Sequence, residues 1–423
     1  VLSGVEAFKL NDTFGFPLDL TREIAAEAGL AVDEAAFHIE MTKQRERARA
    51  ERLAKDISGW SADLFGELTA EPTRFDGYET LSEKAKVLAL SDGEELVDAI
   101  ATDEAGEVKE GVLVVLDKTP FYAEMGGQVA DHGYLVSGDA KLKVTQVKKT
   151  PKGYFVHTCE LLDGTIHVED EVTASVDEKR RAAICRNHTA THLLQKALRE
   201  VLGEHVHQAG SYQDDRLTHF DFTHFSAVTP AELAEVERRV NEKIYEALPV
   251  TVKNLPIEEA KKMGAMALFG EKYGNVVRVV DAGGWSTEFC GGTHVTNTAQ
   301  IGCFKILSES SVAAGIRRVE ATTAFGVLDL LDDRTETLAK TAVALKANNL
   351  KDAPARAEAL AAELKETAKQ LDILKAQVAA SKIDGLFEDA ADVDGVRIVS
   401  AYLTGTGADT LRDMVDKVRD KAP

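Results

Sequence analysis

Cysteine is scarce in this sequence. Only four cysteines occur in 423 residues, and they lie at Cys159, Cys185, Cys290 and Cys303. A small secreted domain held by disulfides has a much higher cysteine content, so this number argues against a disulfide framework. We therefore expect a reducing compartment and a cytoplasmic protein.

Long apolar runs and an excess of positive charge are also missing. No stretch approaches the ~18 apolar residues of a transmembrane helix and no signal peptide is recognisable, so we expect no membrane association. The formal net charge is -21 and the pI is about 5.0. Such an acidic balance argues against non-specific phosphate binding, although it is compatible with a local basic groove.

What the chain does contain is typical of a globular protein with several domains. Hydrophobic residues make up 44% of the sequence, and the length of 423 residues predicts two to four domains. We expect an α+β multidomain fold. Its parts, in order, are N-terminal helices, a small β-barrel, an α+β domain that holds zinc, and a long helical or coiled-coil arm.

The first two segments differ in texture. Residues 1–66 are predicted to be helical, and their charged run from Lys43 to Arg52 is interpreted as a solvated helix face. Residues 67–156 contain short β-branched runs separated by turn residues, which predict a small β-barrel. Within them, Thr119 to Gln128 combines aromatic residues with a Gly-Gly turn. This stretch is either a bulged corner or a loop that faces a ligand.

Three further segments follow. Residues 157–326 have an α+β pattern, with a strongly periodic helix that ends at Gly203. Residues 327–383 are rich in Ala, Leu, Lys and Glu, and their heptad seam predicts a coiled-coil arm through which two chains could form a homodimer. Residues 384–423 are too few to bury a core alone. We interpret them as the truncated start of a C-terminal domain, and the chain as a fragment of a longer protein.

Two short motifs offer metal ligands. Residues 186–192 (RNHTATH) place His188 and His192 four positions apart, so both imidazoles lie on one face of a helix. Residues 288–294 (EFCGGTH) place Cys290 and His294 on either side of two glycines, which permit a tight turn. Three imidazoles and one thiolate form a plausible tetrahedral site, so we predict one Zn²⁺ ion.

The ligand set leaves the role of this zinc open. A metalloprotease helix carries Glu directly after its first His, whereas Thr189 occupies that position here. Four protein ligands are typical of a closed structural site, while catalytic zinc usually keeps one position free. The zinc therefore either expands its coordination when water or substrate enters, or organises a pocket in which other groups act.

Several nearby residues are candidates for the wall of such a pocket. Thr191 follows the first ligand by three positions on the helix, and Gln208 lies just beyond the helix end in a glycine-containing segment. The other histidines of this region lack a metal-binding spacing and are interpreted as structural or surface residues: His205, His207, His219 and His224.

At these residues the sequence resembles the alanyl-tRNA synthetase family. Residues 186–194 (RNHTATHLL) and 289–295 (FCGGTHV) resemble the paired zinc motifs of that family's editing domain. Residues 121–131 resemble a turn of its preceding β-barrel, and residues 8–21 the end of its tRNA-recognition region. Threonyl-tRNA synthetase and free-standing editing proteins carry a similar double motif, but the upstream segment and the downstream heptads favour the alanine enzyme.

The resemblance implies hydrolysis of tRNA(Ala) wrongly charged with serine or glycine. A pocket sized for alanine excludes neither residue well, so a second site has to reject them. In that site the family pattern implies that Thr191 reads the substrate hydroxyl and that Gln208 orients the ester or the water. The amides of Gly291 and Gly292 are candidates for stabilising the ester oxyanion. No ATP site or class II catalytic motif is recognisable, so we expect ATP to act only in the parent enzyme's catalytic domain.

Two other functions remain open at this stage. The chain could be a zinc-stabilised tRNA-binding module without hydrolytic turnover, or a metal-dependent hydrolase that acts on a small ester or peptide. The missing general base disfavours the latter. Basic residues at 141–152, together with Lys179, Arg180, Arg181 and Arg186, are candidate phosphate contacts, with ordinary solvated faces as the alternative interpretation.

Overall fold

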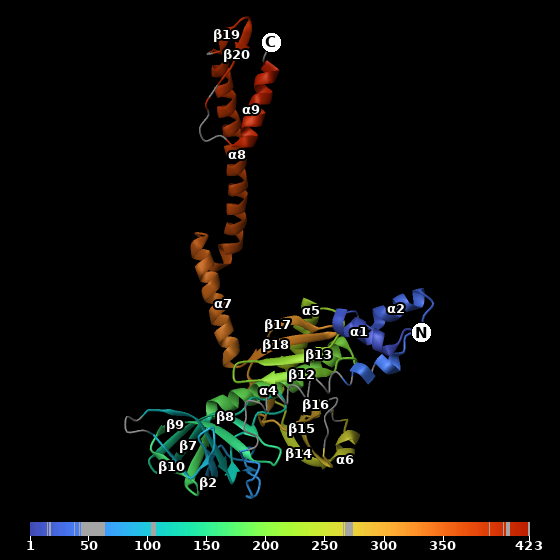
Figure 1. Cartoon of the computed structure of the whole chain (residues 1–423), viewed down its shortest axis with the longest axis vertical. Coiled ribbons are helices and arrows are strands. Elements are labelled where there is room, and N and C mark those ends of the chain that lie inside the picture. Colours follow the sequence, from blue (N-terminus) through green and yellow to red (C-terminus); the bar gives the residue numbers. More distant parts are fainter. Residues whose placement is uncertain are drawn as a thin grey trace. The chain divides into compact units, whose positions relative to one another are not determined.

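A computed structural model of the chain describes residues 1–14, 16, 18–37, 39–41, 43, 64–102, 107–264, 266, 274–388, 390–400, 402 and 407–421. It divides into two compact units, residues 1–329 and residues 330–423 (Figure 1). At the start of the first unit lie helices α1 (Gly4–Phe14) and α2 (Leu18–Glu27), which agrees with the helical prediction for this region. Most of the charged run predicted after Lys43 lies outside the described residues.

A closed β-barrel follows. Six antiparallel strands close the barrel because the last strand, β11, pairs with both β7 and β2. In spatial order the strands are β2 (Ser82–Ser91), β5 (Lys109–Leu116), β9 (Phe155–Asp163), β8 (Ala140–Lys149), β7 (Gly133–Ser137) and β11 (Glu171–Val176). Short pairs flank the barrel: β3 (Leu96–Val97) on β2, β1 (Arg74–Phe75) with β6 (Lys118–Thr119), and β4 (Ala99–Ala101) with β10 (Thr165–His167).

The predicted barrel is confirmed, and it extends further along the chain than its predicted end at residue 156. The reason is closure, since β9 and β11 lie beyond or across that boundary and complete the hydrogen bonding of the edge strands. Alternate residues point inward, as period 2 requires. They bury a core that includes Val87, Val114, Leu116, Leu135, Leu142, Val144, Phe155, Leu161 and Val172.

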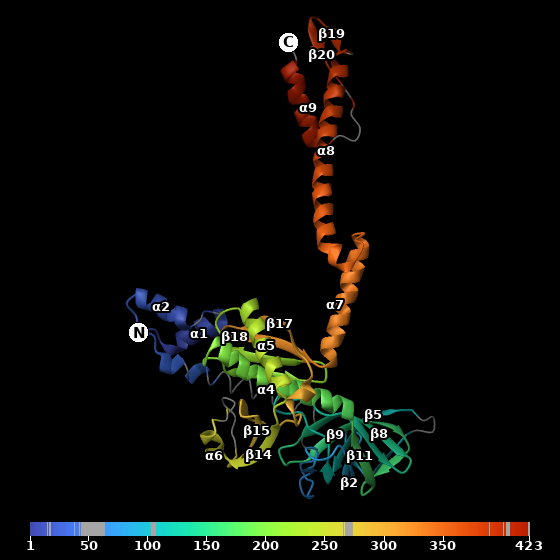
Figure 2. The same cartoon turned by 180° about the vertical axis from the view of Figure 1, so that it is seen from behind.

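Helix α4 (Glu178–Leu202) begins directly after the barrel's closing strand (Figures 1 and 2). Asp177 caps its first turn by accepting a hydrogen bond from Arg180 N at 3.0 Å, and Gly203 with φ 117° ends it. The predicted end of this helix is therefore confirmed. Its apolar residues Leu193, Leu194, Ala197 and Leu198 are fully buried in the second core.

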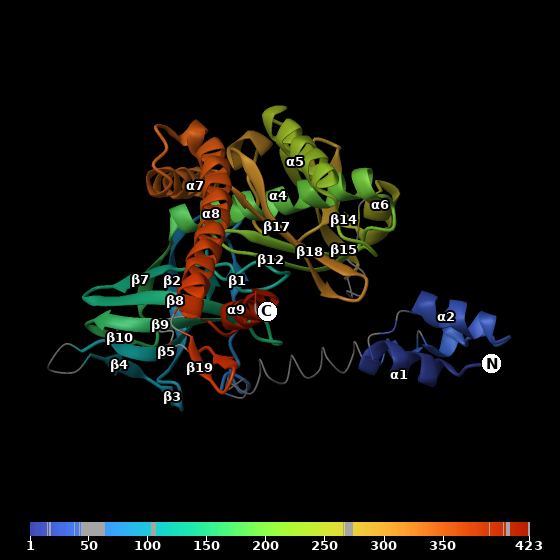
Figure 3. The same ribbon diagram turned by 90° about the horizontal axis from the view of Figure 1, so that it is seen from above.

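The α+β region contains two sheets. Helices α4 and α5 (Pro230–Tyr245) pack against the first sheet, whose order is β12-β13-β18-β17 (Figures 2 and 3). Its strands are β12 (Gln208–Gln213), β13 (Thr218–Thr223), β18 (Ile316–Thr323) and β17 (Phe304–Ala313). The second sheet comprises β14 (Val250–Pro256), β15 (Val276–Ala282) and β16 (Ser286–Phe289), with α6 (Ile257–Lys262) and η1 (Thr298–Ile301) beside these elements in sequence.

The second unit is mainly helical. Helix α7 (Phe325–Ala344) leads into it, and η2 (Leu350–Asp352), α8 (Ala353–Glu388), the hairpin β19 (Ala391–Val393) with β20 (Val396–Ile398), and α9 (Ala408–Lys421) follow. Of the predicted heptad seam, Leu364, Leu371, Leu374 and Val378 are exposed along α8. The long helix is thus present, while the coiled coil, the homodimer and the other predicted domain limits stay predictions. Within the described residues, no helix is long and apolar enough to cross a membrane.

Candidate metal centre

The first pair of predicted ligands lies on one face of α4. His188 and His192 are both buried, and their rings are stacked with centroids 5.4 Å apart and planes inclined by 8°. This follows from the helix geometry, in which residues i and i+4 lie above one another. The neighbouring turns of α4 are fixed by the apolar core, so the two imidazoles project from a rigid element.

The second pair lies on the turn that follows β16. A Cβ atom at Gly292 would approach His188 Cε1 to 2.1 Å, so only glycine lets the backbone pass this imidazole. At Gly291 a Cβ atom would meet no heavy atom within 4 Å. The predicted need for glycine therefore applies to Gly292 and not to its neighbour. Its consequence is that Cys290 and His294 converge on the helix.

The four ligand side chains come together as their spacing predicts. One potential ligand atom from each of His188, His192, Cys290 and His294 lies within 4.8 Å of the others. The sulfur of Cys290 is 3.3 Å from His188 Nε2 and 3.2 Å from His294 Nε2. Two segments about a hundred residues apart in sequence thus form one compact donor set of three nitrogens and one sulfur.

Each of the three imidazoles is oriented by a partner on its Nδ1 atom. His188 donates to Gln128 Oε1 at 2.8 Å, and His294 donates to Thr189 Oγ1 at 3.2 Å. The Nδ1 atom of His192 contacts the carboxylate of Glu288. Such outer partners fix the tautomer of metal-binding histidines and leave Nε2 as the ligand atom.

The charges around the cluster favour the deprotonated, thiolate form of Cys290. Burial raises the pKa of the Cys290 thiol, but the imidazoles of His188, His294 and His192 outweigh this effect and hold that pKa well below its ordinary value. Burial would also lower the pKa of His192, yet Glu288 and Cys290 raise it to about 10. For His294, burial dominates and lowers the pKa to about 3. A deprotonated Cys290 is the form that binds a metal.

These residues fit a zinc ion. His192 Nε2 is buried and has no hydrogen-bond partner among the described residues, although its ring is held from the other side by Glu288. An orphaned buried nitrogen of this kind is costly unless an ion or a ligand satisfies it. Three imidazole nitrogens and one thiolate match the preference of Zn²⁺ for nitrogen and sulfur ligands. The donor set thus supports the predicted metal, whose identity stays a prediction.

The other predicted site residues have definite surroundings. Thr191 is buried, donates to Asn187 O at 2.8 Å, and lies 2.7 Å from the Thr218 hydroxyl on β13. Gln208 begins β12 and donates to Ser211 Oγ at 3.0 Å, so among the described residues its amide contacts none of the four ligands.

The two glycine amides differ. Gly292 N–H donates to Cys290 Sγ at 3.4 Å, which commits this amide to the thiolate. The amide of Gly291 has no acceptor among the described residues, and its carbonyl accepts from the hydroxyl of Tyr78 on the barrel side. Of the two candidate oxyanion donors, Gly291 is therefore the available one.

Three residues that contact the ligand imidazoles were not predicted from the sequence. Gln128, Glu288 and Thr189 orient the ligand imidazoles, but nothing in their spacing reveals these roles. The Gly-Gly turn before Gln128 is the one available signal, because it indicates a loop that approaches other backbone closely. In the structure a Cβ atom at Gly127 would lie 2.5 Å from Ser211 O, so this loop packs against β12.

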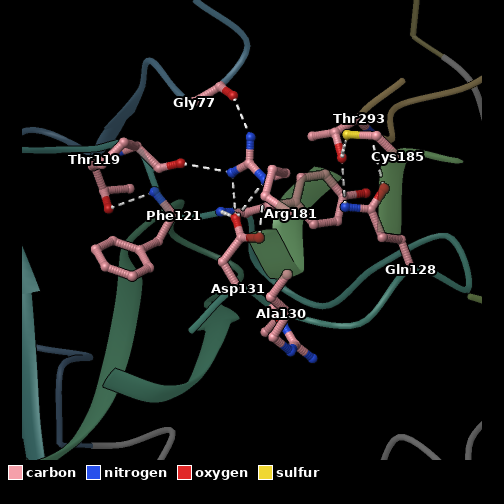
Figure 4. A network of polar contacts seen from close by, with 12 residues as sticks. Gly77, Thr119, Phe121, Gln128, Ala130, Asp131, Arg181, Cys185 and Thr293 are labelled. Atoms are coloured by element: carbon pink, nitrogen blue, oxygen red, sulfur yellow. Dashed lines mark hydrogen bonds and ion pairs between the residues drawn. The ribbon is translucent and has the colours of Figure 1, made fainter. Parts of the chain in front are cut away.

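A buried ion pair connects the barrel to α4 (Figure 4). Arg181 Nε lies 2.9 and 3.0 Å from the two carboxylate oxygens of Asp131, and the two side chains are 5% and 1% exposed. Arg181 also donates to Gly77 O at 2.7 Å and to Pro120 O at 2.9 Å, while Asp131 accepts from Tyr122 N at 2.7 Å. The barrel and helix α4 are therefore rigidly joined.

Comparison with known proteins supports the resemblance seen in the sequence. Residues 1–180 match the family model of the class II (A) tRNA synthetases, and residues 277–320 match that of the threonyl and alanyl tRNA synthetase second additional domain. The second match contains Cys290 and His294, two of the four metal-centre residues. The fold and the site thus occur in a chain related to class II aminoacyl-tRNA synthetases.

Curated relatives agree over the whole chain. An alanine–tRNA ligase of Halalkalibacterium halodurans is 43% identical over 422 residues, which is 100% of this chain and 47% of the relative. Those of Acetivibrio thermocellus and Bacillus cereus are each 44% identical over 100% of this chain and 47% of their own length. The chain belongs to the alanyl-tRNA synthetase family, and it spans about half the length of the curated relatives it matches.

Proposed function

We propose that this chain is the editing portion of an alanyl-tRNA synthetase, and that it hydrolyses the ester of Ser-tRNA(Ala) and Gly-tRNA(Ala). The observation that carries the proposal is the convergence of His188, His192, Cys290 and His294 in a chain of this family. The match of residues 277–320 to the second additional domain supports it further. In the parent enzyme, alanine would be joined to tRNA(Ala) with ATP.

The metal would contribute charge. A zinc ion held by the four ligands would supply Lewis acidity toward an ester carbonyl or a water molecule. The chain's own groups supply position: Gln128, Glu288 and Thr189 hold the imidazoles, and the rigid junction at Arg181 holds α4 against the barrel. Because such a site is already ordered before the substrate binds, no binding energy is lost in ordering its side chains.

Four residues would act on the substrate. The hydroxyl pair of Thr191 and Thr218 would read the serine hydroxyl, which alanine lacks, while Gln208 would orient the ester or the attacking water. The unpaired amide of Gly291 would donate to the oxyanion that forms when water attacks the carbonyl carbon. Glycine has no methyl group, so its acceptance rests on size alone.

Deacylation assays test this proposal directly. Ser-, Gly- and Ala-tRNA(Ala) would be incubated with the chain, with and without a chelator. We expect hydrolysis of the first two and not the third, and loss of both activities with the chelator or with Cys290→Ala. Undiminished hydrolysis by a Cys290→Ala protein that lacks zinc would overturn the proposal.

A second assay tests the selector. Thr191→Val removes the hydroxyl and keeps the side-chain volume, so we expect hydrolysis of the serine ester to fall about 10-fold or more, because a buried polar contact is lost. Hydrolysis of the glycine ester would stay within a few-fold. An equal loss on both esters would contradict a reading role for Thr191.

The alternative is a zinc-stabilised tRNA-binding module. The observation in its favour is the ligand set, because four protein ligands are typical of a closed structural site. A gel-shift that detects tRNA(Ala) binding, together with deacylation assays that show no turnover of any ester, would select this function.

A further inference from the structure

A cavity of about 770 Å³ lies beside the metal centre, between the barrel and the α+β region. Its walls come from the segment at residues 77–81, from the start of α4, from β14 and β15, and from residues 293–296 of the ligand turn. Thr293 and His294 belong both to this wall and to the metal-bearing motif. Three more wall residues, Gly77, Arg181 and Cys185, are labelled in Figure 4.

The cavity contains two guanidinium groups that form no ion pair with a carboxylate of the described residues. The side chain of Arg186 has no hydrogen bond or ion pair to any described residue, and its Nε atom is buried. Among the described residues, the Arg278 side chain donates only to the carbonyls of Cys290 and Gly292, each at 2.8 Å, and its guanidinium carbon lies 4.1 Å from the centre of the Tyr78 ring. The cavity thus offers unpaired positive charge and free N–H donors.

The remaining charged groups of the wall do not cancel this charge. Arg181 is neutralised by Asp131. Glu79 and Glu178 also line the cavity, but both are exposed and neither forms an ion pair with Arg186 or Arg278. In a chain with a net charge of -21, two guanidinium groups without an acidic partner in the described part of the chain indicate a site for an anion.

The chemistry of arginine indicates that the anion is a phosphate group. Its planar fork matches the oxygens of a phosphate group, and a buried N–H without an acceptor is costly until such a group arrives. Because His294 forms part of the same wall, a chain of phosphodiesters that ends at the metal centre would pass through this cavity. The cavity's volume is within the range of sites that bind small ligands.

We infer that the cavity binds a phosphodiester of the single-stranded 3′ end of the RNA, with Arg186 as its principal ligand and Arg278 as a second. This inference rests on the proposed function, because it takes the 3′ end to be the part that reaches the metal centre. Arg186 is one of the basic residues that the sequence indicated as candidate phosphate contacts. Two others, Arg180 and Arg181, already form ion pairs with Asp215 and Asp131.

Binding of uncharged RNA tests the inference independently of hydrolysis. The whole chain would be titrated, at several salt concentrations, with an RNA hairpin that carries a short single-stranded 3′ overhang and with the same hairpin made blunt. For Arg186→Gln we expect about 10-fold weaker binding of the overhang hairpin, because a charged hydrogen bond to phosphate is lost. Its logarithmic salt dependence should become shallower by about 0.7. Binding of the blunt hairpin should not change.

Two controls accompany this measurement. Arg199 lies on the same helix, but it pairs with Glu204 and does not line the cavity. Arg199→Gln should therefore leave the affinities for both hairpins unchanged. Inorganic phosphate should compete with the overhang hairpin for the wild type and only weakly for Arg186→Gln. Equal affinities for wild type and Arg186→Gln, or an equal loss on both hairpins, would overturn the inference. A chain that binds the overhang through Arg186 but hydrolyses no ester would instead refute the proposed function.

Discussion

Gln128 of the barrel region holds His188 of the metal centre. Its Oε1 atom accepts from His188 Nδ1 at 2.8 Å and from Thr293 N at 2.8 Å, and its Nε2 atom donates to Thr293 Oγ1 at 2.9 Å. The buried amide of Gln128 therefore orients His188 on α4 and also fixes the turn that carries Cys290 and His294. The barrel is in this way a structural part of the candidate metal centre.

Loss of this amide should weaken metal binding. Gln128→Leu keeps the approximate volume but removes both the acceptor and the donor, so we expect metal affinity to fall about 10- to 100-fold, as for other outer partners of metal-binding histidines. Competition with a chromogenic chelator measures this. Gln208→Leu, whose amide contacts none of the ligands, is the control and should leave metal affinity unchanged.

The two glycines of the ligand turn should respond differently to alanine. Gly292→Ala places a Cβ atom 2.1 Å from His188 Cε1, so the turn or the imidazole has to move and metal binding should be lost or strongly weakened. Gly291→Ala meets no atom within 4 Å and should bind metal like the wild type. Metal content after purification, measured by atomic emission, distinguishes them. Equal metal content in both variants would contradict the close approach at Gly292.

The pair of Arg181 and Asp131 should be important for stability. Asp131→Ala leaves a buried guanidinium without its carboxylate, and breaking such a pair typically costs about 3–5 kcal/mol. The exposed pair of Lys84 and Glu171 is the control, because Glu171→Ala should cost no more than about 1 kcal/mol. Urea unfolding followed by circular dichroism gives both free energies. A cost below about 1 kcal/mol for Asp131→Ala would contradict the predicted role.

His157 should make the barrel sensitive to acid. It is fully buried, donates from Nδ1 to Val114 O at 3.1 Å, and accepts at Nε2 from the Thr119 hydroxyl at 2.7 Å. Burial lowers its pKa from 6.5 to about 4. The unfolded chain therefore binds a proton first as the pH falls, so this stability is complete above pH 6.5 and is lost between pH 6.5 and about 4.

The expected loss is about 3 kcal/mol, at 1.36 kcal/mol for each unit of pKa. The free energy of unfolding, measured at several pH values for the wild type and for His157→Gln, isolates this contribution. The difference between the two proteins should change between pH 6.5 and about 4. A difference that is independent of pH would show that His157 titrates alike in the folded and unfolded states.

Much of the fold and of the ligand set could be predicted from local patterns. The period of the apolar residues around Leu194 predicted α4 and its end at Gly203, and the spacing of His188 and His192 predicted a shared face. Alternating runs predicted the barrel strands. These features depend on neighbours within a few residues, so the sequence displays them directly.

Contacts between distant segments are of a different kind. The closure of β11 on β2, the pairing of Arg181 with Asp131 and the attachment of Gln128 to His188 join residues 50 or more positions apart. No periodicity records such contacts, because each depends on how whole elements pack. The same is true of Arg186, because only the packed structure reveals that its side chain has no partner among the described residues.

The amino-acid sequence alone thus determined which side chains form the candidate ligand set, because helix geometry and a Gly-Gly turn set their spacing. Only the tertiary structure decided how these ligands are oriented and which neighbouring charges stay unpaired. The physical reason is that ligand spacing is a property of local backbone geometry. Orientation and electrostatic balance, in contrast, arise from the packing of the barrel, α4 and the ligand turn around one buried centre.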